Sequence, residues 1–223
     1  MVPSAGLGER FLGRERKQFC NLAGKPVIIH VLERLIQYRL LNYISLVLPK
    51  TKPSSVVIPT NSDVIIKVVE GGIDRNSSVE NGMKALPIGV KWVVIHDGVR
   101  PLLTKNLLER CLLEADDTGA SLAAFPVSDT LKRSDESLCT FETISRENLW
   151  SAQTPQVVRR DLLEKAFKEV ERQEPEITDE STLLEKIGIR TRVVFSTKTN
   201  LKITTEEDLM FAEFYLREEK NVD

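Results

Sequence analysis

Histidine and cysteine are scarce in this chain, which has two histidines and three cysteines among its 223 residues. The cysteines, Cys20, Cys111 and Cys139, are odd in number and form no C-x-x-C pair. This pattern predicts neither a disulfide framework nor a zinc ribbon, and it indicates a reducing cytoplasm. With only His30 and His96 present, a histidine-rich metal site is excluded. Any bound metal would be held by carboxylates, phosphates and water, which suits magnesium.

Excess charge and long apolar runs are also missing. The formal net charge is −2, which argues against a nucleic-acid footprint, because such a surface needs clustered excess Lys and Arg. No apolar run approaches the ~20 residues of a membrane span. No signal peptide is recognisable, because Met1 leads directly into a glycine-rich turn. We therefore expect one domain over residues 1–223, with neither a membrane nor a nucleic acid as partner.

Short apolar runs alternate with helical patterns along the chain. The apolar runs predict buried strands at residues 43–48, 64–69 and 90–95, and shorter strands at 121–125 and 191–195. The apolar spacing predicts helices at residues 26–38, 77–86, 105–117, 159–172, 181–187 and 205–219. For the last helix we expect a capping box in which Thr204 is the cap and Glu207 its partner. Strands separated by helices indicate an α/β fold with a mostly parallel central sheet.

Two stretches depart from this alternation. Residues 126–149 are polar, lack a helical period and contain alternating pieces around 129–133 and 138–144. We interpret them as a protruding β-hairpin arm, because a long structureless loop is uncommon in a compact domain; a disordered loop is the alternative. The first strand can include only residues 1–3, although a strand usually needs about five residues. We expect either a truncated first strand or a misplaced start codon.

The first loop combines small residues with basic ones. Small residues at 3–8 allow backbone N–H groups to close on phosphate oxygens. The loop is no dinucleotide fingerprint, because Phe11 stands where the third glycine belongs, and no Walker A motif, because Arg14 and Glu15 replace the required Lys and Ser or Thr. A triphosphate needs several cations at close range, and the loop is accompanied by Arg10, Arg14, Arg16 and Lys17. A tight turn with a solvated basic face is the alternative.

Later loops place further polar groups at the ends of predicted elements. Ser77 and Ser78 follow Gly71-Gly72 at the start of a helix, where they could hold ligand groups or simply cap the helix. Asp97 comes just after a buried strand, at the carboxyl end where ligands of parallel sheets lie; an ordinary cap or loop residue is the alternative. His96 is equally compatible with a structural role and with a role as a ligand. Taken individually, the polar segments at 150–156, 177–181 and 200–204 are more often caps or turns than sites.

Together, and in this order, these segments resemble the 2-C-methyl-D-erythritol 4-phosphate cytidylyltransferases of the non-mevalonate isoprenoid pathway. The resemblance covers essentially the whole chain, through residues 3–10, 17–19, 71–72, 96–101, 129–132, 154–156, 178–180 and 201–204. It implies a Rossmann-like three-layer nucleotidyltransferase fold. It also implies a cytoplasmic, magnesium-dependent enzyme that joins CTP to methylerythritol phosphate and releases pyrophosphate, by in-line attack of the substrate phosphate on the α-phosphorus.

The resemblance further implies a role for individual residues. Arg10 and Lys17 would grip the triphosphate, Lys202 would lie near the α-phosphate, and Asp97 would position the metal. CTP would be bound by Pro3, Ser4, Ala5, Gly6, Gly8, Gly72, Ser78, Asp97 and Gly98. The sugar-alcohol phosphate would be bound by Thr178 and, across a homodimer interface formed by the 126–149 arm, by Thr130 and Arg146.

The sequence departs from the family pattern at a few positions and leaves other functions open. Ile73 stands where the family often has an acidic residue, Ser4 replaces a common Ala, and Gly98-Val99 replaces a common Ala-Ala. A ribitol-phosphate or other pentitol-phosphate cytidylyltransferase is one alternative, and a uridylyl- or adenylyl-sugar transferase is another. A catalytically inactive nucleotide-binding protein is a third, against which the retention of Arg10, Lys17, Asp97 and Lys202 argues.

Overall fold

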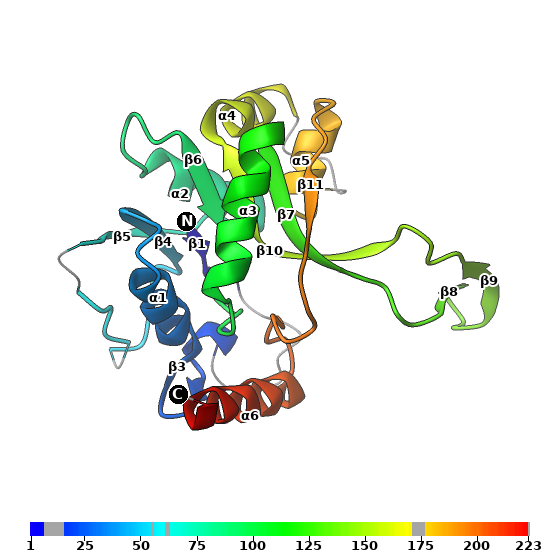
Figure 1. Cartoon of the computed structure of the whole chain (residues 1–223), viewed down its shortest axis with the longest axis horizontal. Coiled ribbons are helices and arrows are strands. Elements are labelled where there is room, and N and C mark those ends of the chain that lie inside the picture. The colour runs from blue at the N-terminus through cyan, green and yellow to red at the C-terminus, as the bar shows by residue number, and fades with distance from the viewer. Residues whose placement is uncertain (7–15, 55, 61–62, 171–176, 223) are drawn as a thin grey trace.

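The computed structural model describes residues 1–6, 16–54, 56–60, 63–170 and 177–222 (Figure 1). Seven of the described strands form one twisted sheet in the order β5-β4-β1-β6-β10-β7-β11. Its two parts meet between β1 and β6, where the Met1 nitrogen donates to Val94 O (2.6 Å) and His96 N donates to Met1 O (3.0 Å). The bounds are β1 Val2–Pro3, β4 Tyr43–Leu48, β5 Ile65–Glu70, β6 Trp92–Ile95, β7 Ala120–Pro126, β10 Trp150–Arg159 and β11 Arg192–Phe195.

The sheet is mainly parallel, as the sequence predicts. Strand β1 pairs in parallel with β4, β4 with β5, and β7 with β11. Within this sheet, as far as the structure describes it, only β10 runs antiparallel to its neighbours, β6 and β7. The carboxyl ends of β1, β4, β5 and β6 therefore meet at one edge of the sheet, where a parallel sheet binds its ligands.

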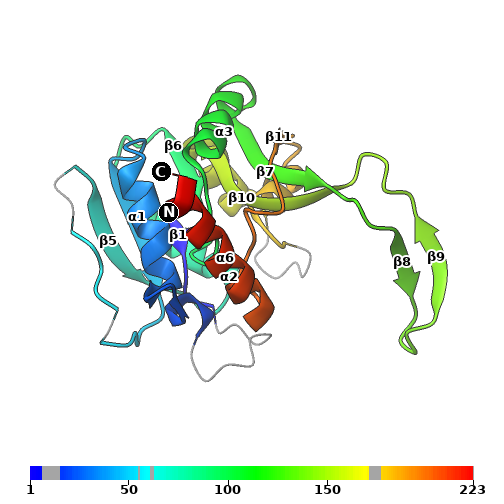
Figure 2. The same ribbon diagram turned by 60° about the horizontal axis from the view of Figure 1, so that its bottom comes forward.

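Helices cover both faces of the sheet and produce three layers. Alternate residues of a strand face opposite sides, so Leu46 packs toward α1 and α3 while Val47 packs toward α2. Helices α4 and α5 lie on the same side as α2, and α6 lies across one end of the domain (Figures 1 and 2). The bounds are α1 Val27–Gln37, α2 Arg75–Lys84, α3 Lys105–Thr118, α4 Arg160–Glu169, α5 Glu180–Lys186 and α6 Glu206–Val222.

The arm leaves the body of the domain between β7 and β10 (Figures 1 and 2). It contains β8 (Leu131–Ser134) and β9 (Thr140–Ile144), which pair antiparallel as a hairpin. Trp150 still pairs with Pro126 at its base, so the two long strands of the sheet continue directly into it. Leu138 and Phe141 on the hairpin are 83% and 65% exposed. The arm thus presents apolar surface away from the core of its own chain.

Several predicted elements need correction. The sequence prediction missed β10, a ten-residue strand that is buried over residues 153–158 although it contains polar residues and Pro155. Strand β5 was predicted as buried, but it is an edge strand in which Ile65 and Val68 are exposed. The predicted Thr204–Glu207 capping box is wrong by one residue. Thr205 N donates to the Asp208 carboxylate (2.9 Å) and Asp208 N donates to the Thr205 hydroxyl (3.2 Å), so the box closes one position later.

Other boundaries differ by a few residues. Helix α2 begins at Arg75 rather than Ser77, because the Asp74 side chain accepts from Ser77 N and caps the helix there. The first strand has two residues, in line with the short strand that the sequence predicts. Short paired strands β2 (Asn21–Leu22) and β3 (Lys25–Pro26) precede α1, and a 3₁₀ helix, η1, spans Lys17–Phe19. No described helix is both long enough and apolar enough to cross a membrane.

Candidate active site

The first loop leaves β1 and lies against Gly98. Ser4 N donates to Val47 O (2.8 Å), and Gly98 N donates to Pro3 O (3.4 Å). A Cβ atom on Gly98 would lie 1.8 Å from the Ser4 hydroxyl oxygen, so only glycine permits this close approach. Pro3 to Gly6 and Gly98 are therefore brought together, whereas the predicted site residues Gly8 and Arg10 lie outside the described residues.

Two side chains that follow the loop hold its backbone in place. The buried Gln18 side chain donates to Ser4 O (2.8 Å) and to Gly6 O (3.3 Å). Arg16 donates to Ala5 O (3.1 Å). Sequence reasoning assigned no role to Gln18, because a single amide carries no motif of its own. Lys17, predicted to grip the triphosphate, lies between them in η1 and is half-buried.

The second glycine pair packs against the first loop. A Cβ atom on Gly71 would lie 2.2 Å from the Cβ atom of Ala5, so this glycine allows the two loops to touch. Gly72 N donates to the Ser78 hydroxyl (3.0 Å), which in turn donates to Asp74 O (2.8 Å). Gly72 and Ser78, both predicted to bind CTP, are therefore hydrogen-bonded to each other beside Ala5.

A buried carboxylate with two cations lies after β6. Asp97 Oδ2 is 2.9 Å from Lys202 Nζ and 3.5 Å from Arg100 Nε. The Asp97 side chain is 9% exposed, whereas that of Lys202 is 37% exposed. Burial alone would raise the pKa of Asp97, but the charges of Lys202, Arg100 and Arg75 outweigh it and hold the pKa well below its usual range. Asp97 is thus ionised and holds the Lys202 ammonium at the mouth of the site.

A buried hydrogen-bond network supports Asp97 from behind. Asp97 N donates to the Thr154 hydroxyl (3.0 Å), which lies 3.1 Å from His96 Nδ1. His96 Nε2 lies 3.1 Å from Arg100 O, so this nitrogen carries the proton and Nδ1 accepts. Burial lowers the pKa of His96 to about 4. His96 is therefore a neutral structural residue, one of the two roles that the sequence leaves equally open for it, and Thr154 is a site residue to which the sequence analysis gave no role.

A third segment reaches this region at the start of α5. Asp179 caps the helix by accepting from Thr182 N (2.9 Å), and it accepts from the Gln156 amide (2.8 Å). Thr178, predicted to contact the substrate, is exposed, and its hydroxyl lies 3.1 Å from that of Thr182. The neighbouring Glu180 is buried and paired with Arg75, a contact that no sequence pattern indicated.

The predicted arm residues lie away from this cluster in their own chain. Thr130 and Arg146 are both exposed. Arg146 donates to Ser128 O, and Lys198 Nζ donates to the Ser128 hydroxyl (2.9 Å). Among the described residues, no hydrogen bond or ion pair joins Thr130 or Arg146 to Asp97 or Lys202. A contribution from the arm to a complete site would therefore come from a second copy of the chain.

The side chains around Asp97 offer few ligands for a metal ion. In the part of the chain that the structure describes, no three acidic, histidine or cysteine side chains gather as a metal site. Magnesium is commonly bound through one or two carboxylates together with substrate phosphates and water. One carboxylate, that of Asp97, lies next to Gly98, which is hydrogen-bonded to Pro3 in the first loop. The residues present therefore fit a magnesium ion that arrives with its phosphate ligands.

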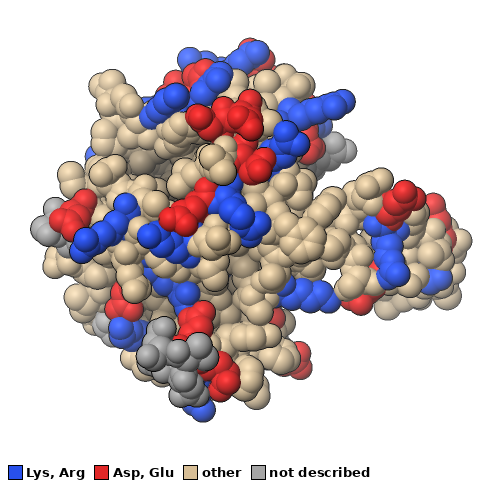
Figure 3. Space-filling model, viewed as in Figure 1, with Lys and Arg blue, Asp and Glu red and all other residues tan. Residues whose placement is uncertain are grey.

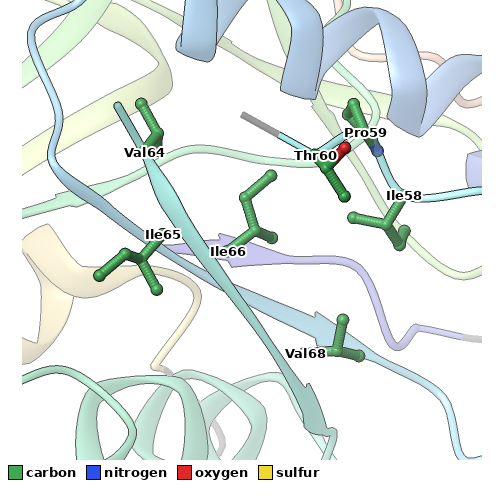
Figure 4. Close-up of a pocket in the computed structure, with 7 residues that line it drawn as sticks. All are labelled: Ile58, Pro59, Thr60, Val64, Ile65, Ile66 and Val68. Carbon is green, nitrogen blue, oxygen red and sulfur yellow. The ribbon is translucent and has the colours of Figure 1, made fainter. Parts of the chain in front are cut away.

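Two other features of the described surface differ in chemistry from the cluster around Asp97. Acidic and basic side chains are interspersed on the face that Figure 3 shows, including the arm. A hollow of about 310 Å³ lies beside edge strand β5 and is lined mainly by aliphatic side chains such as Ile58, Val64 and Ile66 (Figure 4). Strands β4 and β1 separate it from Asp97. This hollow lacks the charged groups that a triphosphate requires.

Comparisons with known proteins agree on one family. A family model described as 2-C-methyl-D-erythritol 4-phosphate cytidylyltransferase matches residues 1–218. A protein with this name from Mannheimia succiniciproducens is 39% identical over 216 residues, which cover 97% of this chain and 94% of the relative. The crystal structure of the enzyme so named from Thermus thermophilus superposes with a TM-score of 0.79 at 28% identity, covering 97% of each chain.

One similar protein is longer. The "Bifunctional enzyme IspD/IspF" of Desulfotalea psychrophila is 40% identical over 222 residues, which cover 99% of this chain. The match covers 57% of that relative, so this chain spans little more than half of its length.

Proposed function

The chain belongs to the 2-C-methyl-D-erythritol 4-phosphate cytidylyltransferase family, and we propose that its reaction takes place at the cluster around Asp97. The enzyme joins CTP and 2-C-methyl-D-erythritol 4-phosphate to give CDP-methylerythritol and pyrophosphate. This location is proposed because the buried Asp97 carboxylate holds the Lys202 ammonium at 2.9 Å beside the first loop. A pentitol phosphate is not favoured as the acceptor, because the similar proteins are named for methylerythritol phosphate.

The reaction requires stabilisation of growing negative charge. A phosphate oxygen of the acceptor attacks the α-phosphorus in line, and the bond from that phosphorus to the bridging oxygen of the β-phosphate breaks. Charge then increases on the α-phosphate oxygens and on the departing pyrophosphate. Lys202 would stabilise the charge on the α-phosphate oxygens, and Lys17 and Arg10 would bind the triphosphate. Because such cations are fixed before the reaction, they stabilise the transition state without reorganisation.

The nucleotide would lie between the two glycine loops. Residues Pro3 to Gly6 and Gly98 would contact CTP largely through their backbones, with Gly72 and Ser78 on the other side. Support comes from the contact between Gly71 and Ala5, which brings both loops to one place, and from the Gln18 amide, which fixes the carbonyl groups of Ser4 and Gly6. Gly8 would complete this part of the site.

We further propose magnesium as the divalent metal. Asp97 would supply one carboxylate oxygen, and the triphosphate and water would supply the remaining ligands. When bound, the ion neutralises phosphate charge. Asp97 also keeps Lys202 oriented, which is its role independent of the metal.

The acceptor would be bound by Thr178 from one subunit and by the partner's Thr130 and the partner's Arg146 in a homodimer. The projecting arm supports this arrangement, because it exposes Leu138 and Phe141 to a neighbouring chain. We also propose a cytoplasmic location, which fits the three free cysteines, Cys20, Cys111 and Cys139.

Pyrophosphate release tests the function. Purified protein would be incubated with CTP and magnesium, with methylerythritol phosphate or ribitol phosphate as acceptor. We expect rapid release with methylerythritol phosphate, none without an acceptor, and none after chelation of the metal. Asp97→Asn should lose most of this activity while it keeps its fold. Release with ribitol phosphate alone would move the chain to the pentitol branch. Binding of CTP without release would favour an inactive nucleotide-binding protein.

A further inference from the structure

An ion pair between α2 and α5 joins the two halves of the site. The Arg75 guanidinium donates to both carboxylate oxygens of Glu180, at 2.6 and 2.9 Å. The Glu180 side chain is 2% exposed and that of Arg75 is 30% exposed. Two parallel hydrogen bonds between planar groups fix the orientation of both side chains as well as their separation. This pair is therefore a rigid link rather than a loose surface contact.

Each partner is the first residue of a helix that follows a proposed substrate segment. Arg75 comes directly after Asp74 and the Gly71-Gly72 loop, and its helix α2 packs on β1, β4 and β5. Glu180 comes directly after Thr178 and Asp179, and its helix α5 packs on α4. The pair thus links the segment proposed to bind CTP to the segment proposed to contact the acceptor.

The surroundings of the pair tie it to the reaction centre. The charges of Glu180, Asp97 and Asp179 together raise the pKa of Arg75, although its burial acts in the opposite direction. Gln156 on β10 holds the Glu180 side of the link, because its amide donates to Asp179 (2.8 Å) and accepts from Ser181 N (3.1 Å). Arg75 therefore lies within a single electrostatic cluster with Asp97, and the acceptor segment is attached to that cluster.

Stability alone gives a weak reason for such a pair. Removing two charges from water is costly, and well-packed apolar residues often stabilise a fold equally well. A bidentate pair does, however, specify one relative position of the two segments that it joins.

We propose that Arg75 and Glu180 are positioning residues that set the distance between the CTP loop and the acceptor segment. The inference rests on the proposed function. In-line attack requires the acceptor oxygen and the α-phosphorus to be aligned, and a displacement of about 1 Å can cost on the order of 10²-fold in rate. Neither residue needs to touch the reacting atoms. Loss of the pair should impair use of the acceptor while CTP still binds.

The test compares Glu180→Gln with a matched control. Glu164→Gln removes a carboxylate of the Arg160–Glu164 pair (2.7 Å) on α4, which is outside the site. For each protein, kcat, both KM values and the melting temperature would be measured, with CTP affinity determined by calorimetry. We expect Glu180→Gln to lower kcat/KM for the acceptor by ~10- to 100-fold and to change the Kd for CTP less than about twofold. Glu164→Gln should match the wild type in these kinetic values.

Three further variants complete the test: Glu180→Asp, Arg75→Gln and the double variant Arg75→Gln/Glu180→Gln. In Glu180→Asp the charge remains but the carboxylate is one methylene shorter, so a folded protein with the same acceptor defect is expected even if Glu180→Gln does not fold. Arg75→Gln combined with Glu180→Gln should be no worse than the poorer single variant, because one link is lost in each case. Wild-type acceptor kinetics in a folded Glu180 variant, with only a lower melting temperature, would overturn the proposal. Additive losses in the double variant would also overturn it. A failure of the proposed function is distinct, because the wild type itself would then release no pyrophosphate.

Discussion

The hydroxyl oxygen of Ser4 occupies the space that a side chain on residue 98 would need. A Cβ atom on Gly98 would lie 1.8 Å from this oxygen and 2.6 Å from the Cδ1 atom of Ile28. Ser4 is buried, and its hydroxyl has no hydrogen-bond partner in the described part of the chain. Ser4 and Gly98 are thus two parts of one packing arrangement.

We predict that this arrangement appears as coupling between two substitutions. Gly98→Ala should destabilise the protein by about 1–3 kcal/mol, because a methyl group is forced into filled space. Ser4→Ala alone should be neutral or slightly stabilising, since it removes a buried hydroxyl without a partner. The Ser4→Ala/Gly98→Ala double variant should recover about half of the loss or more. Urea unfolding of the four proteins measures the coupling, and a double variant as unstable as Gly98→Ala would contradict it.

Lys17 should be required for turnover and not for folding. We expect Lys17→Ala to lower kcat by ~10²-fold or more, by analogy with removal of one preorganised donor, while the urea midpoint changes little. Lys25→Ala is the matched control, because it removes the same charge from the exposed Lys25–Glu33 pair. Steady-state pyrophosphate release gives kcat for both variants, and urea unfolding gives their midpoints. Normal activity in Lys17→Ala would remove this residue from the proposed machinery.

His96 should make stability depend on pH below neutrality. Its pKa is lowered by burial to about 4, whereas an unfolded histidine titrates near ~6.5. Between these values the unfolded chain binds more protons, so stability is complete above pH ~6.5 and decreases as the pH falls toward 4. Over this pH range the free energy of unfolding decreases by about 3 kcal/mol.

His96→Gln, which can still donate to Arg100 O, is the comparison for this prediction. Urea unfolding at several pH values between 7 and 4.5 should show a steeper fall for the wild type than for the variant. Parallel curves for the two proteins would show that His96 is protonated equally in the folded and unfolded states.

The arm should control both assembly and use of the acceptor. Phe141, 65% exposed on the hairpin, would be covered in a dimer, so Phe141→Glu should yield a monomer by light scattering. Its kcat/KM for the acceptor should fall at least ~10-fold, because the arm of one subunit would no longer reach the other site. Val57→Glu, at a position 76% exposed beside β5, should change neither mass nor activity. A monomeric wild type with full activity would contradict the dimer.

Local patterns in the sequence were sufficient for much of the fold. The apolar periodicity predicts α1, α3 and β4 to within about a residue at each end, because each buries one face along a regular element. Small residues and cations marked the loops at 3–8 and 70–78, since glycine is needed where two backbones approach closely. Strand β10 was missed because its buried residues include Gln153, Thr154 and Gln156. Their polar groups are satisfied by hydrogen bonds, so the strand shows no apolar pattern in the sequence.

The sequence by itself therefore determined the alternating elements, the hairpin and the family resemblance, all of which depend on residues close together along the chain or on motifs in order. Only the tertiary structure decided which polar groups meet. Arg75 and Glu180 are 105 residues apart in sequence, and Lys202 reaches Asp97 from the far end of the chain. A charged side chain on a helix or loop has many possible partners. The sheet order and the helix packing select one of them, because a charge can be buried at tolerable cost only where its partner lies within hydrogen-bond distance.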